Sequence, residues 1–129
     1  MIMAGKLYFN KEHLWVKVEG NKGTIGISAH AQEELGDVLL VETSGVRHKV
    51  QQSESFGQIE SAKAVSDLIS PVTGTIIEIN EILEDEPELI NEDPYGKGWL
   101  VKVIMDDTGE LDNLLSEDDY NQYLQEEYS

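Results

Sequence analysis

The sequence predicts a mainly β protein, a small sandwich or barrel of antiparallel strands with a helical C-terminal segment. Short runs of alternating or β-branched residues recur along most of the chain. Turn-forming residues separate these runs, and the alternation stops near residue 107. Many short strands spaced by turn signals are typical of all-β sandwiches and barrels.

The first half contains a hairpin, a short helix and one more strand. The segments 14–19 (LWVKVE) and 23–28 (GTIGIS) are strand-like and joined by GNKG, a hairpin signal. Ser28 is an expected N-cap for a helix of one or two turns over 29–35, which ends at Gly36. The apolar run at 37–43 (DVLLVET) predicts a buried strand.

The second half predicts four further strands. They are expected over ESFGQIES (54–61), AVSDLIS (64–70), TIIEIN (75–80) and WLVKVIM (99–105). Residues 91–98 (NEDPYGKG) are expected to form the loop before the last of them.

The C-terminal part has a helical pattern over 108–115 and 116–127, with Thr108 and Ser116 as expected N-caps. The apolar stripe on the second helix can dock on the β body; it comprises Tyr120, Tyr123 and Leu124. With 129 residues and 40% hydrophobic content, we expect a single domain over 1–129, with 108–127 packed on it as a helical segment.

The formal net charge of −17 limits the partners. Such a field repels nucleic acid and anionic membranes, so both are excluded, while partners with basic docking surfaces are favoured. The chain has no cysteine, and its first ten residues lack the pattern of a signal peptide. We therefore expect a cytoplasmic protein without disulfides, thiolate metal sites or a cysteine nucleophile.

Lys63 is the only Lys or Arg between Lys49 and Lys97, in an interval crowded with acids. The strands on either side of it can pair as a hairpin, and the small residues Ser61, Ala62 and Ala64 fall where the chain must turn. Lys63 would then project from the apex.

An exposed lysine is protonated at neutral pH, and nearby carboxylates favour that charge, so Lys63 is poorly suited to Schiff-base catalysis. A modifying enzyme could deprotonate and acylate it. Two interpretations stay open at this point, a modified lysine and an acidic β-sandwich interaction module whose lysine only faces solvent.

The segment ESAKAVSDLISPVTG resembles the lipoylation site of the glycine cleavage system H proteins. The similarity continues in KEHLWVKVEG, in IGISAHAQEELGDVLLVE and in NEILEDEPELINEDPYGKGWLVKV, and covers about residues 7–125 in order and spacing.

This resemblance implies a barrel-sandwich hybrid, a flattened β-sandwich that acts as a carrier and not as an enzyme. Lipoate would be attached to Lys63 by a lipoate ligase or lipoyl transferase, with Glu60, Ser61, Ala64 and Asp67 in the recognised surface. The arm would carry an aminomethyl group from a pyridoxal-phosphate glycine decarboxylase to a tetrahydrofolate-dependent aminomethyltransferase, and electrons to the FAD enzyme dihydrolipoyl dehydrogenase. A roaming carrier is expected to be a monomer.

The resemblance also implies a cleft that shelters the loaded arm, with Glu12, His13, Leu14 and Asp67 as its expected residues. The family usually has an acid where this chain has Leu14, and leucine cannot pair with an amine. Either Glu12 or Asp67 substitutes, or the arm is less protected. A lipoyl relay protein that serves other lipoate-dependent complexes is therefore the alternative within the family.

Other chemistries fit the sequence less well. Biotin carriers typically have methionines beside the lysine, whereas alanines flank Lys63. His13, His30 and His48 lie on separate segments without metal-ligand spacing, and the acidic run after residue 105 lacks the order of a calcium loop. No metal site is expected.

Overall fold

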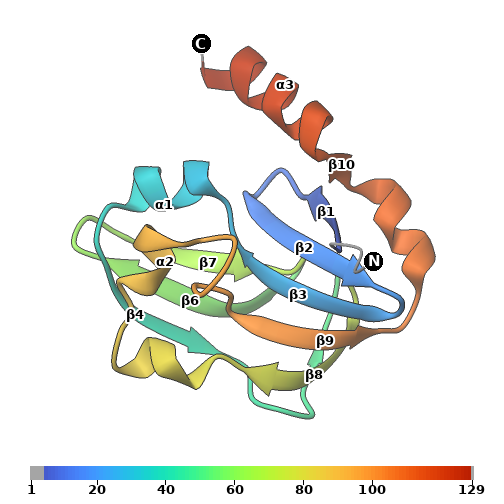
Figure 1. The fold of residues 1–129 in the computed structure, drawn as a ribbon, viewed down its shortest axis with the longest axis horizontal. Helices are drawn as coiled ribbons and strands as arrows, with labels where there is room; N and C mark the ends of the chain where they lie inside the picture. The colour runs from blue at the N-terminus through green and yellow to red at the C-terminus, as the bar shows by residue number, and fades with distance from the viewer. Residues whose placement is uncertain (1–4, 129) are drawn as a thin grey trace.

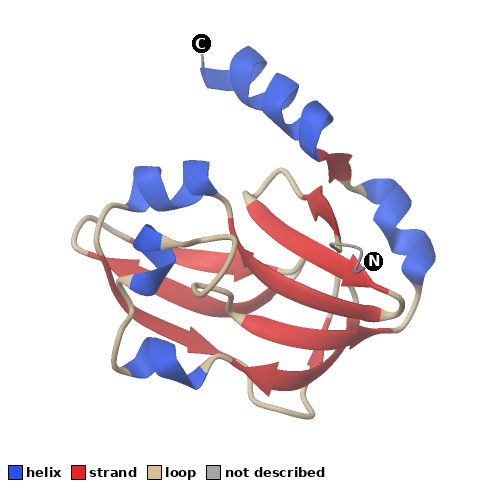
Figure 2. Ribbon diagram, viewed as in Figure 1, coloured by secondary structure: helices blue, strands red, loops and turns tan. Residues whose placement is uncertain are grey.

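The computed structural model describes residues 5–128 and folds them into two antiparallel sheets with a few short helices (Figures 1 and 2). Residues 1–4 and Ser129, the ends of the expected 1–129 domain, lie outside the described part. The predicted mainly β sandwich is confirmed, and neither sheet closes into a barrel.

The larger sheet has seven strands in the order β10-β1-β2-β3-β9-β8-β5. Their bounds are β1 Lys6–Phe9, β2 Leu14–Glu19, β3 Lys22–Ile27, β5 Lys49–Val50, β8 Gly74–Ile79, β9 Val101–Met105 and β10 Leu115–Ser116. The alternation of the sequence predicted β2, β3, β8 and β9, whereas β1 and the two-residue strands β5 and β10 carry too little periodicity to be read from sequence.

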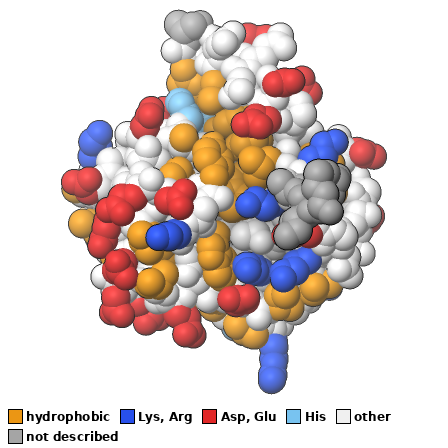
Figure 3. All heavy atoms as spheres, in the orientation of Figure 1, with side chains coloured by type: hydrophobic (Ala, Val, Ile, Leu, Met, Phe, Trp, Pro, Cys, Tyr) orange, Lys and Arg blue, Asp and Glu red, His pale blue; other side chains and the backbone are white. Residues whose placement is uncertain are grey.

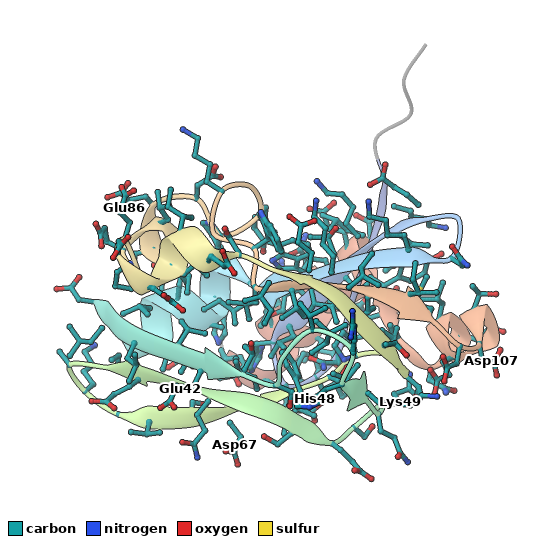
Figure 4. All side chains as sticks on the ribbon, turned by 90° about the horizontal axis from the view of Figure 1, so that it is seen from below. Glu42, His48, Lys49, Asp67, Glu86 and Asp107 are labelled. Atoms are coloured by element: carbon teal, nitrogen blue, oxygen red, sulfur yellow. The ribbon has the colours of Figure 1, made fainter. Side chains whose placement is uncertain are left out.

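The smaller sheet has three strands in the order β4-β6-β7, with bounds Val38–Thr43, Ser55–Ser61 and Val65–Ile69. It lies under the larger sheet in Figure 4, and apolar side chains from both sheets form one buried core. Buried members include Ile59 and Leu68 from the small sheet and Val16, Ile25 and Val103 from the large one.

A β-bulge in β6 changes the side of the sheet to which Phe56 points. Strict alternation puts Phe56 on the same face as Gln58 and Glu60. The pairing of β6 with β7 shifts between Ser55 and Gly57, so Phe56 instead joins Ile59 in the core. A bulge places one extra residue in a strand, and this reverses the face of the residues that precede it.

The helices surround the sheets. They are α1 Ala29–Leu35, the 3-10 helix η1 Glu81–Glu84, α2 Leu89–Glu92, the 3-10 helix η2 Thr108–Asn113 and α3 Glu117–Tyr128. The predicted cap of α1 is confirmed, since the Ser28 hydroxyl accepts a hydrogen bond from the Ala31 N–H. α2 begins before the expected 91–98 loop and includes its first two residues.

The C-terminal segment differs in part from the prediction. Residues 108–113 form a 3-10 helix, and its cap is Asp107 and not Thr108, because the Asp107 carboxylate accepts from the Gly109 N–H. Ser116 does cap α3 by accepting from the Asp119 N–H. Tyr120 is buried and stacks on Phe9 with ring centroids 4.3 Å apart, so the expected apolar stripe contacts the β body at β1.

Candidate functional site

The turn between β6 and β7 carries Lys63 and is closed by Ser61. Glu60 pairs with Val65 across the hairpin, and the Ser61 N–H donates to the carbonyl of Ala64 at 2.8 Å. The buried Ser61 hydroxyl accepts from the N–H groups of both Lys63 and Ala64, at 3.2 and 3.1 Å. A serine side chain that receives the free amides of a turn fixes its shape.

The Lys63 side chain is exposed, and within residues 5–128 its amine forms no salt bridge or hydrogen bond. The turn is the green loop at the left edge of Figure 1. The stem of the lysine leans towards the end of α1, where a Cβ added to Gly36 would lie 3.3 Å from Lys63 Cε. Gly36 has a φ of +76°, a conformation that glycine adopts without cost.

A rigid base supports this turn from the side of α1. The Ala62 N–H donates to the carbonyl of Asp37 at 3.1 Å. Asn91 of α2 fixes the same segment, since its side chain donates to the Gly36 carbonyl and accepts from the Val38 N–H. The lysine therefore projects from a turn tied to two neighbouring elements and not from a free loop.

The loop that connects β1 and β2 is tied to the hairpin by Asn10. The Asn10 side-chain oxygen accepts from the N–H groups of Glu12 and Leu14, and its amide donates to the carbonyl of Ile69 in β7 at 2.9 Å. His13 adopts a φ of +73° in this loop. A left-handed conformation is uncommon outside glycine, and such strain often marks a functional position.

A cleft of ≈ 280 Å³ lies between this loop, α1 and β7, and it begins at Ala64, one residue beyond the lysine. Its apolar lining includes the buried Leu14, Ile27, Ile59 and Leu68. The acidic residues Glu12, Glu34 and Asp67 also line it, although the Asp67 carboxylate accepts a hydrogen bond from Gln58 at 3.3 Å on the outer face of the small sheet. Three hollows among residues 5–128 are larger, of ≈ 310, ≈ 340 and ≈ 410 Å³, but none of them contains a residue of the Lys63 turn, so the smaller cleft is the candidate site.

The four residues expected from the sequence to form an arm cleft, Glu12, His13, Leu14 and Asp67, all line this cavity. Glu34 was missed, because it lies on α1 and reaches the cleft only in the folded chain. Leu14 is 2% exposed and forms part of the apolar lining. Of the residues expected to be recognised by a modifying enzyme, Glu60, Ala64 and Asp67 are exposed, whereas Ser61 is buried in the turn.

The C-terminal helix reaches the cleft through His13. His13 Nδ1 hydrogen-bonds the Tyr120 hydroxyl at 2.8 Å, and Nε2 hydrogen-bonds that of Tyr128 at 3.0 Å. The His13 and His30 ring centroids lie 4.7 Å apart, so the fold joins two histidines that are distant in the sequence. His30 Nε2 is buried 2.9 Å from Glu34 Oε1, without the alignment of a hydrogen bond.

The pKa of His13 is lowered from its usual value, first by burial and then by the neighbouring His30, while Glu34 opposes the shift. Above a pH of about 6.5 the group is neutral in both the folded and the unfolded chain and gives no pH dependence. As the pH falls from there through the folded-state pKa, the unfolded chain binds the proton first, so the folded state loses stability.

We expect His13→Asn to reduce this loss, because asparagine tolerates the left-handed backbone but does not titrate. Urea unfolding of both proteins between about pH 7.5 and 5.5 measures the effect. The free energy of unfolding should fall more steeply for the unsubstituted protein. Parallel curves would show that His13 does not contribute.

Charge is distributed unevenly over the surface. Acidic side chains gather over the part of the molecule that carries α2, η1 and the Lys63 turn (Figure 3). Lysines concentrate on the larger sheet, where β1, β2, β3 and β9 carry Lys6, Lys17, Lys22 and Lys102. The end with the lysine turn is thus the more anionic one.

Within residues 5–128, no group of three or more His, Cys, Asp or Glu side chains is arranged to hold a metal ion. In the same part of the chain no helix has the length and apolar character needed to cross a membrane.

A two-sheet β scaffold that presents one lysine on a fixed turn beside an apolar cleft has the architecture of a carrier domain. Comparison with known proteins agrees with this class. The family described as "Glycine cleavage H-protein" matches residues 7–127. The chain belongs to this glycine cleavage H-protein family, as its resemblance to the lipoylation segment predicted.

Individual relatives cover nearly the whole chain. The glycine cleavage system H proteins of Staphylococcus carnosus and Carboxydothermus hydrogenoformans are 51% and 50% identical to it over 98% of its length, and over 100% and 97% of their own. A crystal structure of a glycine cleavage system H protein from Mycobacterium marinum has a TM-score of 0.85 and 36% identity, covering 95% of this chain and 99% of that one.

Proposed function

We propose that the protein is a lipoyl carrier of the glycine cleavage system, with lipoate joined to Lys63 by an amide bond and without catalytic activity of its own. The observation that carries the proposal is the exposed lysine on a fixed turn, in a chain whose relatives are named H proteins of that system. Its partners would be glycine decarboxylase, aminomethyltransferase and dihydrolipoyl dehydrogenase, with a lipoate ligase or lipoyl transferase as the modifying enzyme.

The turn suits acylation because it holds the amine in solvent while its own amides are satisfied. Ser61 receives the N–H groups of Lys63 and Ala64, so a foreign active site does not need to order this backbone. A pre-organised segment binds with a smaller entropic cost. Within the described residues no carboxylate is in salt-bridge contact with the Lys63 amine, so the modifying enzyme has no ion pair to break.

The cleft fits an acyl arm that starts at Lys63, since Ala64 lines it and much of its lining is apolar. When attached, a lipoyl group supplies reversible disulfide–dithiol chemistry and a sulfur able to carry a one-carbon unit. Leu14, Ile59 and Leu68 would exclude water from one side of the arm. Glu34 would hold a positive charge near its end, because a carboxylate in a partly enclosed site favours a cation.

Glu34 can supply the carboxylate that is missing at Leu14. The loop position where the family usually has an acid is apolar here, but α1 brings another carboxylate to the same cavity. This placement favours the glycine cleavage role over that of a lipoyl relay, because a cleft for a cationic load is retained. A cytoplasmic location and a monomeric state stay predictions.

Reconstitution tests the proposal. The purified protein is lipoylated and added to glycine decarboxylase, and the exchange of glycine carboxyl carbon with bicarbonate is followed. We expect a rate that saturates with the concentration of the lipoylated protein and disappears for the unmodified one. A lipoylated protein that fails to support exchange but donates its lipoyl group to other carriers would establish the relay instead.

A further inference from the structure

We propose that the outer face of the three-stranded sheet, directly next to the Lys63 turn, is the docking surface for the enzyme that acylates this lysine. This inference rests on the proposed function, because it requires Lys63 to be modified. We call this surface the tip face, and it comprises Leu40, Glu42, Gln58, Glu60, Val65 and Asp67.

The strand register places these side chains on one face in two rows. Leu40 pairs with Glu60, which pairs with Val65, and Glu42 pairs with Gln58, which pairs with Asp67. Directly paired residues in antiparallel strands point to the same side of the sheet. Ile59 and Ser61 are buried on the opposite side, so the tip face is the outer one, and Figure 4 labels Glu42 and Asp67 there.

The row nearest the turn holds two large apolar side chains that are exposed to solvent. Val65 is 59% and Leu40 45% exposed. A register shift between Val38 and Leu40 also leaves Leu39 exposed beside Leu40, so the expectation of a buried strand over 37–43 was wrong for this part of β4. Strand bulges often occur next to functional sites, where they change the direction of side chains. Leu40 and Val65 flank Glu60 and so form the apolar part of the tip face next to Lys63.

Apart from Gln58, the rest of the tip face is acidic. Glu42, Glu60 and Asp67 add three carboxylates, and none of them forms a salt bridge within residues 5–128. An apolar pair among unpaired acids fits a partner with an apolar contact and a basic rim. The complementary partner is therefore a protein with basic side chains around its active-site entrance.

The short reach of the unmodified lysine indicates which partner must dock on the tip face, namely the acylating enzyme. Its amine is separated from the turn by one lysine side chain, so an active site that reaches it must also touch the hairpin. Enzymes that act on the finished arm can work at a distance from the sheet. The amine attacks the carbonyl carbon of a lipoyl-adenylate, the new C–N bond forms as the bond to AMP breaks, and the nitrogen loses a proton.

The test is steady-state lipoylation of the full-length unmodified protein by a lipoate ligase with lipoate and ATP, followed by intact mass. Leu40→Thr combined with Val65→Thr should lower kcat/KM about tenfold, mostly through KM, since two apolar contacts are removed. Threonine keeps the β propensity of both strands. Ile77→Thr, at an exposed position on β8 in the other sheet, is the matched control and should change kcat/KM less than twofold.

Two further measurements distinguish the outcomes. Leu40→Thr alone should also slow lipoylation. Because Leu40 does not line the cleft, such a loss would not come from a change in the cleft. Once lipoylated by long incubation, the Leu40→Thr variant should be a normal substrate of dihydrolipoyl dehydrogenase. Unchanged kcat/KM for lipoylation, or an equal loss with the dehydrogenase, would overturn the tip face as the docking surface of the acylating enzyme. Failure of the unsubstituted protein to be lipoylated would overturn the proposed function as well.

Discussion

Lys63→Arg should abolish lipoylation while leaving the fold unchanged. Arginine keeps the positive charge, but its guanidinium stays protonated and cannot act as an acyl acceptor. The Lys63 side chain is exposed and makes no salt bridge within residues 5–128, so the free energy of unfolding should change by less than about 0.5 kcal/mol. Intact mass after incubation with ligase, lipoate and ATP measures the loss.

Lys97→Arg is the matched control, because Lys97 is another exposed lysine outside the hairpin. This variant should gain one lipoyl group per chain, as should the unsubstituted protein. Added mass on the Lys63→Arg protein would place the modification elsewhere and contradict the proposed site.

The largest loss of stability is expected from Gly57→Ala. A Cβ at this position would collide with the carbonyl oxygen of Glu42 and lie 2.8 Å from Thr43 Cα, so the obstacle is the backbone of β4. A rotamer change cannot relieve a clash with backbone, and β4 and β6 would have to separate. We expect the free energy of unfolding to fall by about 3 kcal/mol in urea denaturation.

Gly45→Ala is the control for this substitution. The nearest atom to a Cβ there is His48 Nδ1 at 3.9 Å, which is ordinary contact, so the change should stay within about 0.5 kcal/mol. If Gly57→Ala cost less than about 1 kcal/mol, the close approach of β4 and β6 would not be a constraint on the hairpin scaffold.

Sequence patterns predicted those strands and helix caps whose signal lies within a few neighbouring residues. Alternation located β2, β6, β7, β8 and β9, and Ser28 and Ser116 were identified as caps. The short strands β1, β5 and β10 form because neighbouring strands of the folded sheet are available as pairing partners. Segments this short show no recognisable alternation in the sequence. Strict alternation would place Phe56 on the wrong face, because a bulge is a property of strand pairing and not of the local sequence.

The candidate site was likewise predicted only in part. Lys63 was predicted as the modified residue from its isolation and its surrounding motif. Glu12, His13, Leu14 and Asp67 were predicted from the resemblance, and all four line the cleft. Glu34, and the contacts of His13 with His30, Tyr120 and Tyr128, join segments up to 115 residues apart. No local pattern encodes such distances, so these residues emerge only from the folded chain.

The uneven charge of the surface has a consequence for how the protein meets a partner. On the face drawn in Figure 3 the acidic end also carries the lysine turn, so the charge of the molecule is unevenly distributed, with its negative side at the turn. In the field of a basic entrance the molecule experiences a torque that turns the hairpin forward before contact. The rotational search shortens, and association with a basic partner can be fast without being tight.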